Sequence, residues 1–198
     1  MQRPTLNADA LKNILDDMGP LPLGAKLFAA DAKAMCTNMD TKHVLFVLKN
    51  VIDSTTHLLP KWHPRKLLIA ALKEMMTNHL FQFGDTNWRQ ISGAAMGASC
   101  AVNCATLCFA DWENKNVLSG TLDHVLKLCK RHIDDVFGTW LPHVNSPLLW
   151  HLFKQCLDEC RKLRWKVCRL SDSVVFLDLE IWTNKKPEGS NIESTKNL

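Results

Sequence analysis

The chain has 198 residues, of which 46% are hydrophobic and 22% charged, the composition of an ordinary globular domain with a buried core. Its net charge of +4 permits contact with a polyanion but falls short of the strongly basic balance that would demand one. No apolar run approaches the roughly 18 residues of a membrane span, and the first residues do not form a secretory signal. We therefore expect an intracellular protein, cytoplasmic or nuclear, with no membrane partner and with its eight cysteines as free thiols.

The first part of the chain is expected to be mainly helical around one buried strand. Asn7 can cap a first helix, Ala8–Met18. Residues 25–32 form an apolar run that predicts a buried strand, with Asp31 close to its end. The helical spacing of apolar residues then predicts two further helices, 41–52 and 65–80.

The rest of the chain alternates between strand and helix patterns. Residues 81–91 alternate around a Gly-Asp-Thr-Asn turn and predict a β-hairpin, and a loop of small residues, 92–101, leads into a helix that runs to residue 112. The later elements are expected in the order strand 122–130, acidic hairpin, helix 147–163, and a final strand pair, 165–169 and 174–182, that turns at 171–173. We expect one domain over residues 1–183 and a polar, disordered tail over 184–198.

Two adjacent carboxylates, Asp134 and Asp135, are expected at the tip of the acidic hairpin, between Ile133 and Val136. Like charges so close together repel unless a cation lies between them. A third carboxylate, Asp31, lies at the end of another apolar strand. One carboxylate beside a pair on a neighbouring hairpin is what a two-metal phosphoryl-transfer site requires. Taken alone, the acids also fit a solvated turn or a metal-dependent nuclease.

Four motifs of the chain resemble those of Penelope-like retroelement reverse transcriptases. Residues 31–39 (D-A-K-A-M-C-T-N-M) are similar to the family's D-V-x-S-L-Y-T-N-I, and 131–140 (R-H-I-D-D-V-F-G-T-W) to its R-Y-I-D-D-I-F-x-x-W. The run 81–107, which begins F-Q-F-G-D-T-N-W-R-Q-I-S-G-A-A-M-G, is similar to the family's F-x-F-x-x-x-x-Y-x-Q-I-x-G-T-A-M-G. Residues 176–181 (F-L-D-L-E-I) resemble its F-L-D-L-x-I. The four motifs follow one another in the family's order.

The resemblance implies the α+β fold of a polymerase palm. In such a palm a ferredoxin-like antiparallel sheet bears the acids, and helices pack on its other face. The fingers and thumb of the family are expected to be largely missing. Asp178 and Glu180 fall on one face of the predicted strand 174–182, so we expect that strand to be structural.

The resemblance also implies an RNA-directed DNA polymerase, a nucleotidyltransferase of retroelement origin. Asp31 and Asp134 would bridge two Mg²⁺ ions, for which Mn²⁺ can substitute, and Asp135 would support the site. The partners would be an RNA template, a DNA primer and a dNTP, with the oligomeric state left open. Substrate contacts are implied at five positions: Cys36, Gln90, Gly93, Met96 and Gly97.

Some positions depart from the family pattern. Cys36 stands where the family has the aromatic residue that abuts the sugar 2′ position, which leaves the choice between dNTP and rNTP open. The alternative to an active polymerase is an inactive remnant that keeps the palm fold. Such a remnant would bind nucleic acid weakly through a basic cluster at Lys154, Arg161, Lys162 and Arg164.

Overall fold

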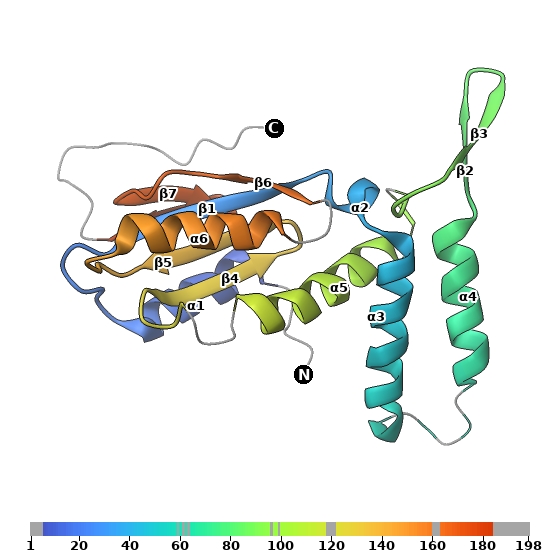
Figure 1. Ribbon diagram of the computed structural model, residues 1–198, viewed down its shortest axis with the longest axis horizontal. Coiled ribbons are helices and arrows are strands. Elements are labelled where there is room, and N and C mark those ends of the chain that lie inside the picture. Colours follow the sequence, from blue (N-terminus) through green and yellow to red (C-terminus); the bar gives the residue numbers. More distant parts are fainter. Residues whose placement is uncertain are drawn as a thin grey trace.

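A four-stranded antiparallel sheet forms the centre of the protein (Figure 1). The computed structural model describes residues 6–58, 60, 62, 64–95, 97–98, 100–117, 122–159 and 163–183. The sheet consists of β1 (Lys26–Lys33), β4 (Leu126–His132), β5 (Asp135–Trp140) and β6 (Arg164–Val167), in the spatial order β4-β5-β1-β6. Helices separate β1 from β4 and β5 from β6, so this order is that of the ferredoxin-like split β-α-β arrangement. The expected mixed class with an antiparallel sheet is confirmed.

Both faces of the central strand β1 carry packed side chains. Phe28, Ala30 and Ala32 belong to one buried apolar cluster, and Leu27 belongs to a second cluster on the opposite face. This double coverage explains why the strand is an almost continuous apolar run. Asp31 shares the face of Leu27 but is exposed, which places it beyond the edge of the second cluster.

The first face of the sheet is covered by α5 (Ala101–Asn116) and α6 (Ser146–Asp158). The ring of Phe28 meets Trp150 and Phe153 of α6 edge-on, with centroids 5.2 and 5.1 Å apart. Gly138 of β5 makes room for this ring, because a Cβ at that position would collide with it. The largest aromatic cluster of the core therefore depends on one glycine.

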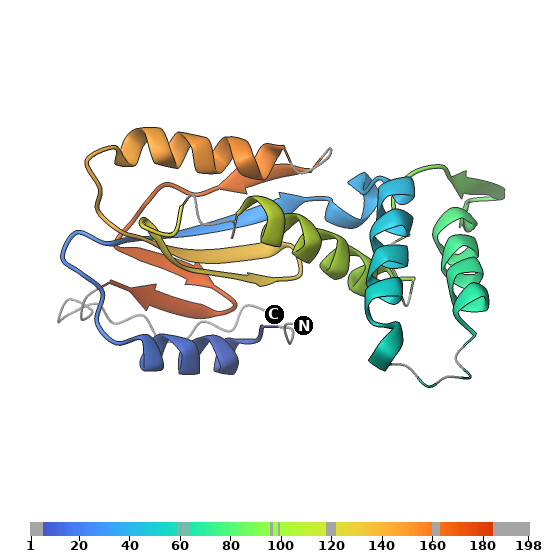
Figure 2. The same ribbon diagram turned by 60° about the horizontal axis from the view of Figure 1, so that its bottom comes forward.

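The second face is partly covered by α1 (Ala8–Met18) and by the hairpin of β7 (Ser173–Phe176) and β8 (Leu179–Trp182). Figure 2 shows α6 on one side of the sheet and α1 on the other. The expectation that helices pack on one face alone is therefore wrong, because Leu11 of α1 is buried against the face that bears the acids. The predicted cap is present, since the Asn7 side chain accepts a hydrogen bond of 2.7 Å from the Ala10 amide.

A helical arm extends from one end of the sheet (Figure 1). It contains α2 (Met35–Asn38), α3 (Thr41–Ser54), the short helix η1 (Thr56–Leu58), α4 (Arg65–Thr77) and the hairpin of β2 (His79–Phe83) and β3 (Thr86–Gln90). The predicted hairpin is confirmed, but its first strand begins at His79, so the helix predicted over 65–80 ends three residues early. Phe81 and Trp88 pair on one exposed face of this hairpin.

The end of the described chain differs most from the sequence expectation. Among the described strands, β6 pairs with β1 and β7 pairs with β8, so the predicted pairing of 165–169 with 174–182 is wrong. Leu177 and Asp178, with φ of 48° and 63°, form a two-residue turn that splits the predicted strand 174–182 in two. Asp178 and Glu180 consequently do not lie on one strand. The predicted tail over 184–198 lies outside the described residues.

None of the helices within the described ranges combines the length and the hydrophobicity that a membrane crossing requires.

Candidate active site

Four side chains form a row across all four strands of the sheet, on the second face, which α1 covers only in part. In the strand registers His132 of β4 lies opposite Asp135 of β5, Asp135 lies opposite Asp31 of β1, and Asp31 lies opposite Lys166 of β6. Directly opposed residues of antiparallel strands point to the same face, with Cβ atoms about 4.5–5.5 Å apart. The sheet therefore brings Asp31 and Asp135 together although a hundred or so residues separate them in the chain.

Asp134 lies in the two-residue turn between β4 and β5, and Asp135 is the first residue of β5. Only Asp134 is thus at the tip where both acids were expected. Its backbone carbonyl accepts a hydrogen bond of 2.9 Å from the Ala32 amide, which ties the turn to β1. Ile133, the other turn residue, has φ of 53°, a left-handed conformation that is costly for a β-branched side chain. Strain of this kind persists only where the surroundings hold it in place.

The surroundings that hold this turn centre on Arg131. Its guanidinium donates hydrogen bonds to the carbonyl of Ile133 (2.7 Å) and to the carbonyl of Thr106 in α5 (3.1 Å). It also forms an ion pair of 3.4 Å with Glu113 of α5, in which both side chains are more than nine-tenths buried, and it lies 4.6 Å from the ring centroid of Phe109. A buried cation thus connects α5 directly to the turn that carries Asp134.

The three acids repel one another. The pKa of the Asp135 carboxyl is raised, first by partial burial and then by the charges of Asp134 and Asp31, while His132 acts in the opposite direction. Three carboxylates are the oxygen donors that Mg²⁺ prefers, so the chemistry of the set fits a divalent metal. As the side chains stand, no three His, Cys, Asp or Glu residues of the described chain are gathered closely enough to hold one ion. Asp31 is exposed, and a change of its rotamer is a small step.

Two of the expected substrate positions meet beside the acids. The Cys36 carbonyl in α2 accepts a hydrogen bond of 2.7 Å from the Ala94 amide, and a Cβ at Gly93 would strike the carbonyls of Cys36 and Thr37. Gly93 also has φ of 75°, so glycine is needed there on both counts. Burial, followed by the charge of Asp134, raises the pKa of the Cys36 thiol, which places this thiol within electrostatic reach of the acidic turn.

Solved structures that resemble this architecture include telomerases. No protein-family model matches the chain, and no curated protein matches its sequence. The chain resembles telomerase from Candida albicans in complex with a TWJ fragment of telomeric RNA, with a TM-score of 0.63 and 12% identity over 88% of this chain and 32% of that one. It also resembles telomerase from Candida tropicalis in complex with the same kind of RNA fragment (TM-score 0.67, 12% identity, 95% of this chain and 34% of that one) and in the apo form (0.62, 11%, 87% and 33%). The fold is reverse-transcriptase-like.

The chain spans about a third of the length of these telomerase chains. At such low identity the similarity establishes the fold alone, so the chemistry of the site has to be inferred from the residues of this chain. In the reverse-transcriptase-like fold the carboxylate of Asp31 comes from the first strand of the sheet, and Asp134 and Asp135 come from the hairpin beside it.

The structure gives less support to the other three expected substrate positions, Gln90, Met96 and Gly97. The side-chain amide of Gln90 donates a hydrogen bond of 2.7 Å to the carbonyl of Ser92, so it turns back on its own strand end. Gly97 is exposed with φ of 94° and has open space around it. Met96 lies outside the described residues. The contacts of the described chain therefore connect Cys36 and Gly93 to each other, and they do not connect Gln90 or Gly97 to the acids.

An open hollow of about 580 Å³ lies against the row of side chains that crosses the sheet. Asp31, Asp135 and Lys166 line it on the sheet side, and Phe176 and Asp178 line it on the side of the β7–β8 hairpin. Sequence reasoning did not find Lys166, and it did not find the role of Arg131. The position of Lys166 depends on the pairing of β6 with β1, for which the sequence carries no local signal.

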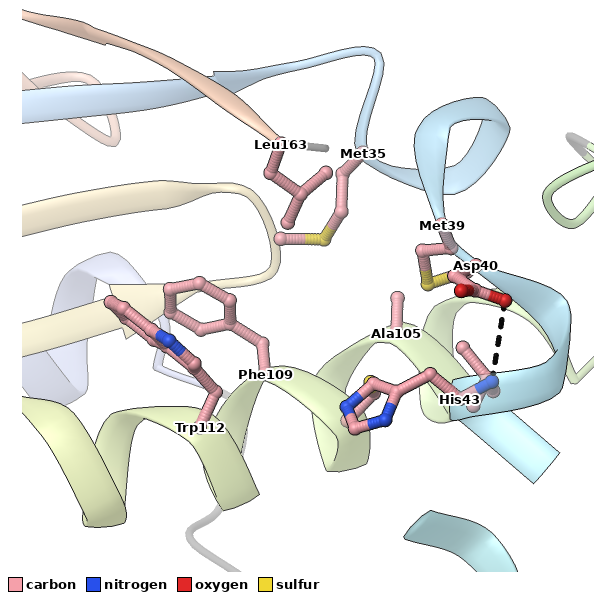
Figure 3. Close-up of a pocket in the computed structure, with 10 residues that line it drawn as sticks. Met35, Met39, Asp40, His43, Ala105, Phe109, Trp112 and Leu163 are labelled. Atoms are coloured by element: carbon pink, nitrogen blue, oxygen red, sulfur yellow. Dashed lines mark hydrogen bonds between the residues drawn. The ribbon is translucent and has the colours of Figure 1, made fainter. Parts of the chain in front are cut away.

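A second recess, shown in Figure 3, is an apolar seam and not a substrate site. It lies between the segment from Met35 to Val44 and α5, where the side chains of Met35 and Leu163 point toward one another (Figure 3). Its interior volume of about 30 Å³ has room for water but not for a nucleotide.

Proposed function

We propose that the chain is the palm of an RNA-directed DNA polymerase that transfers a nucleotide from a dNTP to a primer 3′-hydroxyl. The observation that carries this proposal is the direct opposition of Asp31 and Asp135, beside the turn of Asp134, on a ferredoxin-like sheet shared with telomerase structures. Nothing in the packing of the sheet requires two carboxylates to face each other, and like charges in this arrangement destabilise it. A ligand that needs both carboxylates explains why they are there.

Asp31 and Asp134 would hold two Mg²⁺ ions, or Mn²⁺ in their place, with Asp135 in support. When bound, such ions lower the pKa of the attacking hydroxyl and stabilise the charge on the leaving pyrophosphate. The protein's own contribution is position. Arg131 fixes the turn of Asp134 against α5, and the Ala32 amide fixes the same turn against β1.

The substrate contacts of the proposal lie on the α2 side of the acids. Cys36, held near Asp134, is the residue we assign to the sugar of the incoming nucleotide. Its side chain is smaller than the aromatic residue of the Penelope-like motif, so we expect weak discrimination between deoxyribose and ribose. Gly93 lets the loop after β3 lie flat on the backbone of α2.

The partners in the proposal are an RNA template and a DNA primer. Two of the telomerase structures of similar fold contain a fragment of telomeric RNA, which supports an RNA partner here. The order of the four motifs supports a retroelement of the Penelope-like branch as the source of the chain.

One observation favours the alternative, an inactive remnant with the same fold. Within the described ranges the acids do not form a group of three ligands around one point. Of the basic residues assigned to a remnant, Lys154 is half-buried on α6, Arg164 is exposed on β6, and Arg161 and Lys162 lie outside the described residues.

Primer extension on an RNA template tests the proposal. The assay uses Mg²⁺ or Mn²⁺, with dNTPs and rNTPs supplied separately, on the wild-type chain and on two isosteric variants, Asp134→Asn and Asp123→Asn. We expect extension by the wild type and by Asp123→Asn, whose side chain is exposed in the turn before β4, and none by Asp134→Asn.

Two further outcomes of this assay are informative. Cys36→Tyr should increase the preference for dNTPs over rNTPs if Cys36 faces the sugar. A wild-type chain that binds the primer–template duplex and extends it with neither metal would favour the remnant.

A further inference from the structure

Three basic side chains stand beside the acids on the same face of the sheet. Lys33 of β1 lies directly opposite Arg164 of β6, and Lys166 lies opposite Asp31. Residues two apart on one strand share a face, so all three cations point to the side of Asp31. All three side chains are exposed.

The opposition of Lys33 and Arg164 is unfavourable without a ligand. Like charges directly opposite on neighbouring strands destabilise a sheet. Within the described residues none of the three cationic groups takes part in an ion pair, whereas Lys26 is paired with Asp172, and Lys115 with Asp111. Lys33 and Arg164 are therefore a pair of like charges directly opposite each other, as Asp31 and Asp135 are, but the charges are positive instead of negative.

The two like-charge pairs lie next to each other. Asp31–Asp135 and Lys33–Arg164 are two residues apart along β1, which is roughly 6.6 Å of strand. A ligand that satisfies both pairs must carry a divalent cation at one end and several anionic oxygens beside it. A nucleotide triphosphate bound to a divalent metal has this charge pattern.

Open space lies over the cations. Lys166 lines the hollow that contains Asp31, whereas Lys33 and Arg164 line a separate hollow of about 540 Å³ that reaches Asp158 of α6 and Leu163 and therefore lies at the β6 edge of the sheet. Trp165 also lines this separate hollow, and its indole Nε1 is a buried donor without a hydrogen-bond partner among the described residues. Asp158, on the same wall, accepts a hydrogen bond of 3.3 Å from the Trp165 amide.

From this arrangement we infer that Lys33, Arg164 and Lys166 form a binding site for the polyphosphate of the incoming nucleotide. The inference rests on the proposed function and adds to it the residues that bind the leaving group. A polynucleotide backbone shares the phosphate chemistry, but it would need positive charge along a length of surface. These three cations are instead compact and border the acids, with Cys36 three residues beyond Lys33 for the sugar.

Inorganic tripolyphosphate is the probe, because it carries the phosphate charges without base or sugar. Its affinity is measured by isothermal titration calorimetry on three forms of the 198-residue chain. These are the wild type, a variant with Lys33, Arg164 and Lys166 replaced by Ser, and a control with the same change of charge at Lys42, Lys49 and Lys73, which are exposed on α3 and α4. We expect the first variant to lose affinity about tenfold or more, and the control to stay within about twofold of the wild type.

The same titrations are run without metal and on the Asp31→Asn, Asp134→Asn double variant. Binding to the cations needs neither metal nor catalysis, so an inactive chain can still confirm the site. Failure of the polymerase proposal and failure of this one are thereby separated. Thermal unfolding serves as the folding control, and the Lys33→Ser change should not lower the melting temperature, because it removes a like-charge pair.

Two results would overturn the inference. The first is equal tripolyphosphate affinity in the basic-residue variant and the control. The second is a variant that keeps its tripolyphosphate affinity but loses affinity for an RNA–DNA duplex, which would make the cations a contact for the polynucleotide backbone.

Discussion

The buried pair of Arg131 and Glu113 provides the most decisive test of how the acidic turn is held. Their side chains are 7% and 8% exposed, and the guanidinium also serves the carbonyls of Ile133 and Thr106. Arg131→Met removes the cation beside Glu113 and the donors to both carbonyls. Breaking a buried ion pair in this way costs about 3–5 kcal/mol, a large part of the ordinary stability of a domain. We expect Arg131→Met to lower the free energy of unfolding by that amount.

The assay is urea unfolding followed by circular dichroism, arranged as a double-mutant cycle with Glu113→Leu. Because apolar residues can replace a buried ion pair without loss, the double variant should recover about 2 kcal/mol or more relative to the sum of the single changes. Lys115→Met is the matched control on α5. It breaks an exposed pair with Asp111 and should cost less than about 1 kcal/mol.

The reasoning is refuted if Arg131→Met costs no more than the Lys115→Met control, or if the cycle shows no coupling. A second readout separates stability from position. The double variant regains stability but not the hydrogen bond to Ile133, so primer extension should stay impaired even where folding is restored.

Three further changes have defined outcomes. Asp178→Gly should raise the free energy of unfolding by about 0.5–1 kcal/mol in urea titrations, because φ of 63° costs glycine nothing; a loss of stability would contradict the turn. Burial and its cysteine neighbours raise the pKa of the Cys104 thiol to about 12, so iodoacetamide at neutral pH should modify exposed Cys168 and spare Cys104, as peptide mass spectrometry would show. The hydrogen bond from Lys26 lowers the pKa of the Asp172 carboxyl, so its stabilisation is present at neutral pH and is lost as the pH falls through that lowered pKa. Lys26→Met should accordingly unfold at less urea than the wild type at pH 7 and at the same urea at about pH 2, and an equal difference at both pH values would contradict this.

Much of the fold follows from local patterns. Ala8–Met18 has the predicted bounds because its cap, periodicity and terminating glycine are all local. The predicted strand 174–182 fails for an equally physical reason. Residues 174–177 are all apolar, and Leu177, Leu179 and Ile181 then alternate with polar residues, so the strand pattern hides a turn whose residues include neither glycine nor asparagine.

The residues of the candidate site could likewise be predicted only where a local pattern specifies them. The acids could be singled out because they lie in motifs that resemble those of one family, although taken alone they also fit a solvated turn. Lys166 and Arg164 could not be found, because their positions are set by the register of β6 on β1, which no local pattern specifies. Arg131 was visible in a motif, but its contacts with α5 depend on packing between distant segments.

The central position of β1 also has a consequence for how the protein comes to its native state. This strand leaves the ribosome before both of its neighbours in the sheet, β5 and β6, which follow it by about a hundred residues or more. Until they emerge, an apolar strand has no partner and is open to misassembly or to chaperones. The row of acids and cations is therefore complete only after β6 has paired with β1, so a truncation before β6 would remove Arg164 and Lys166 and leave β1 with an unpaired edge.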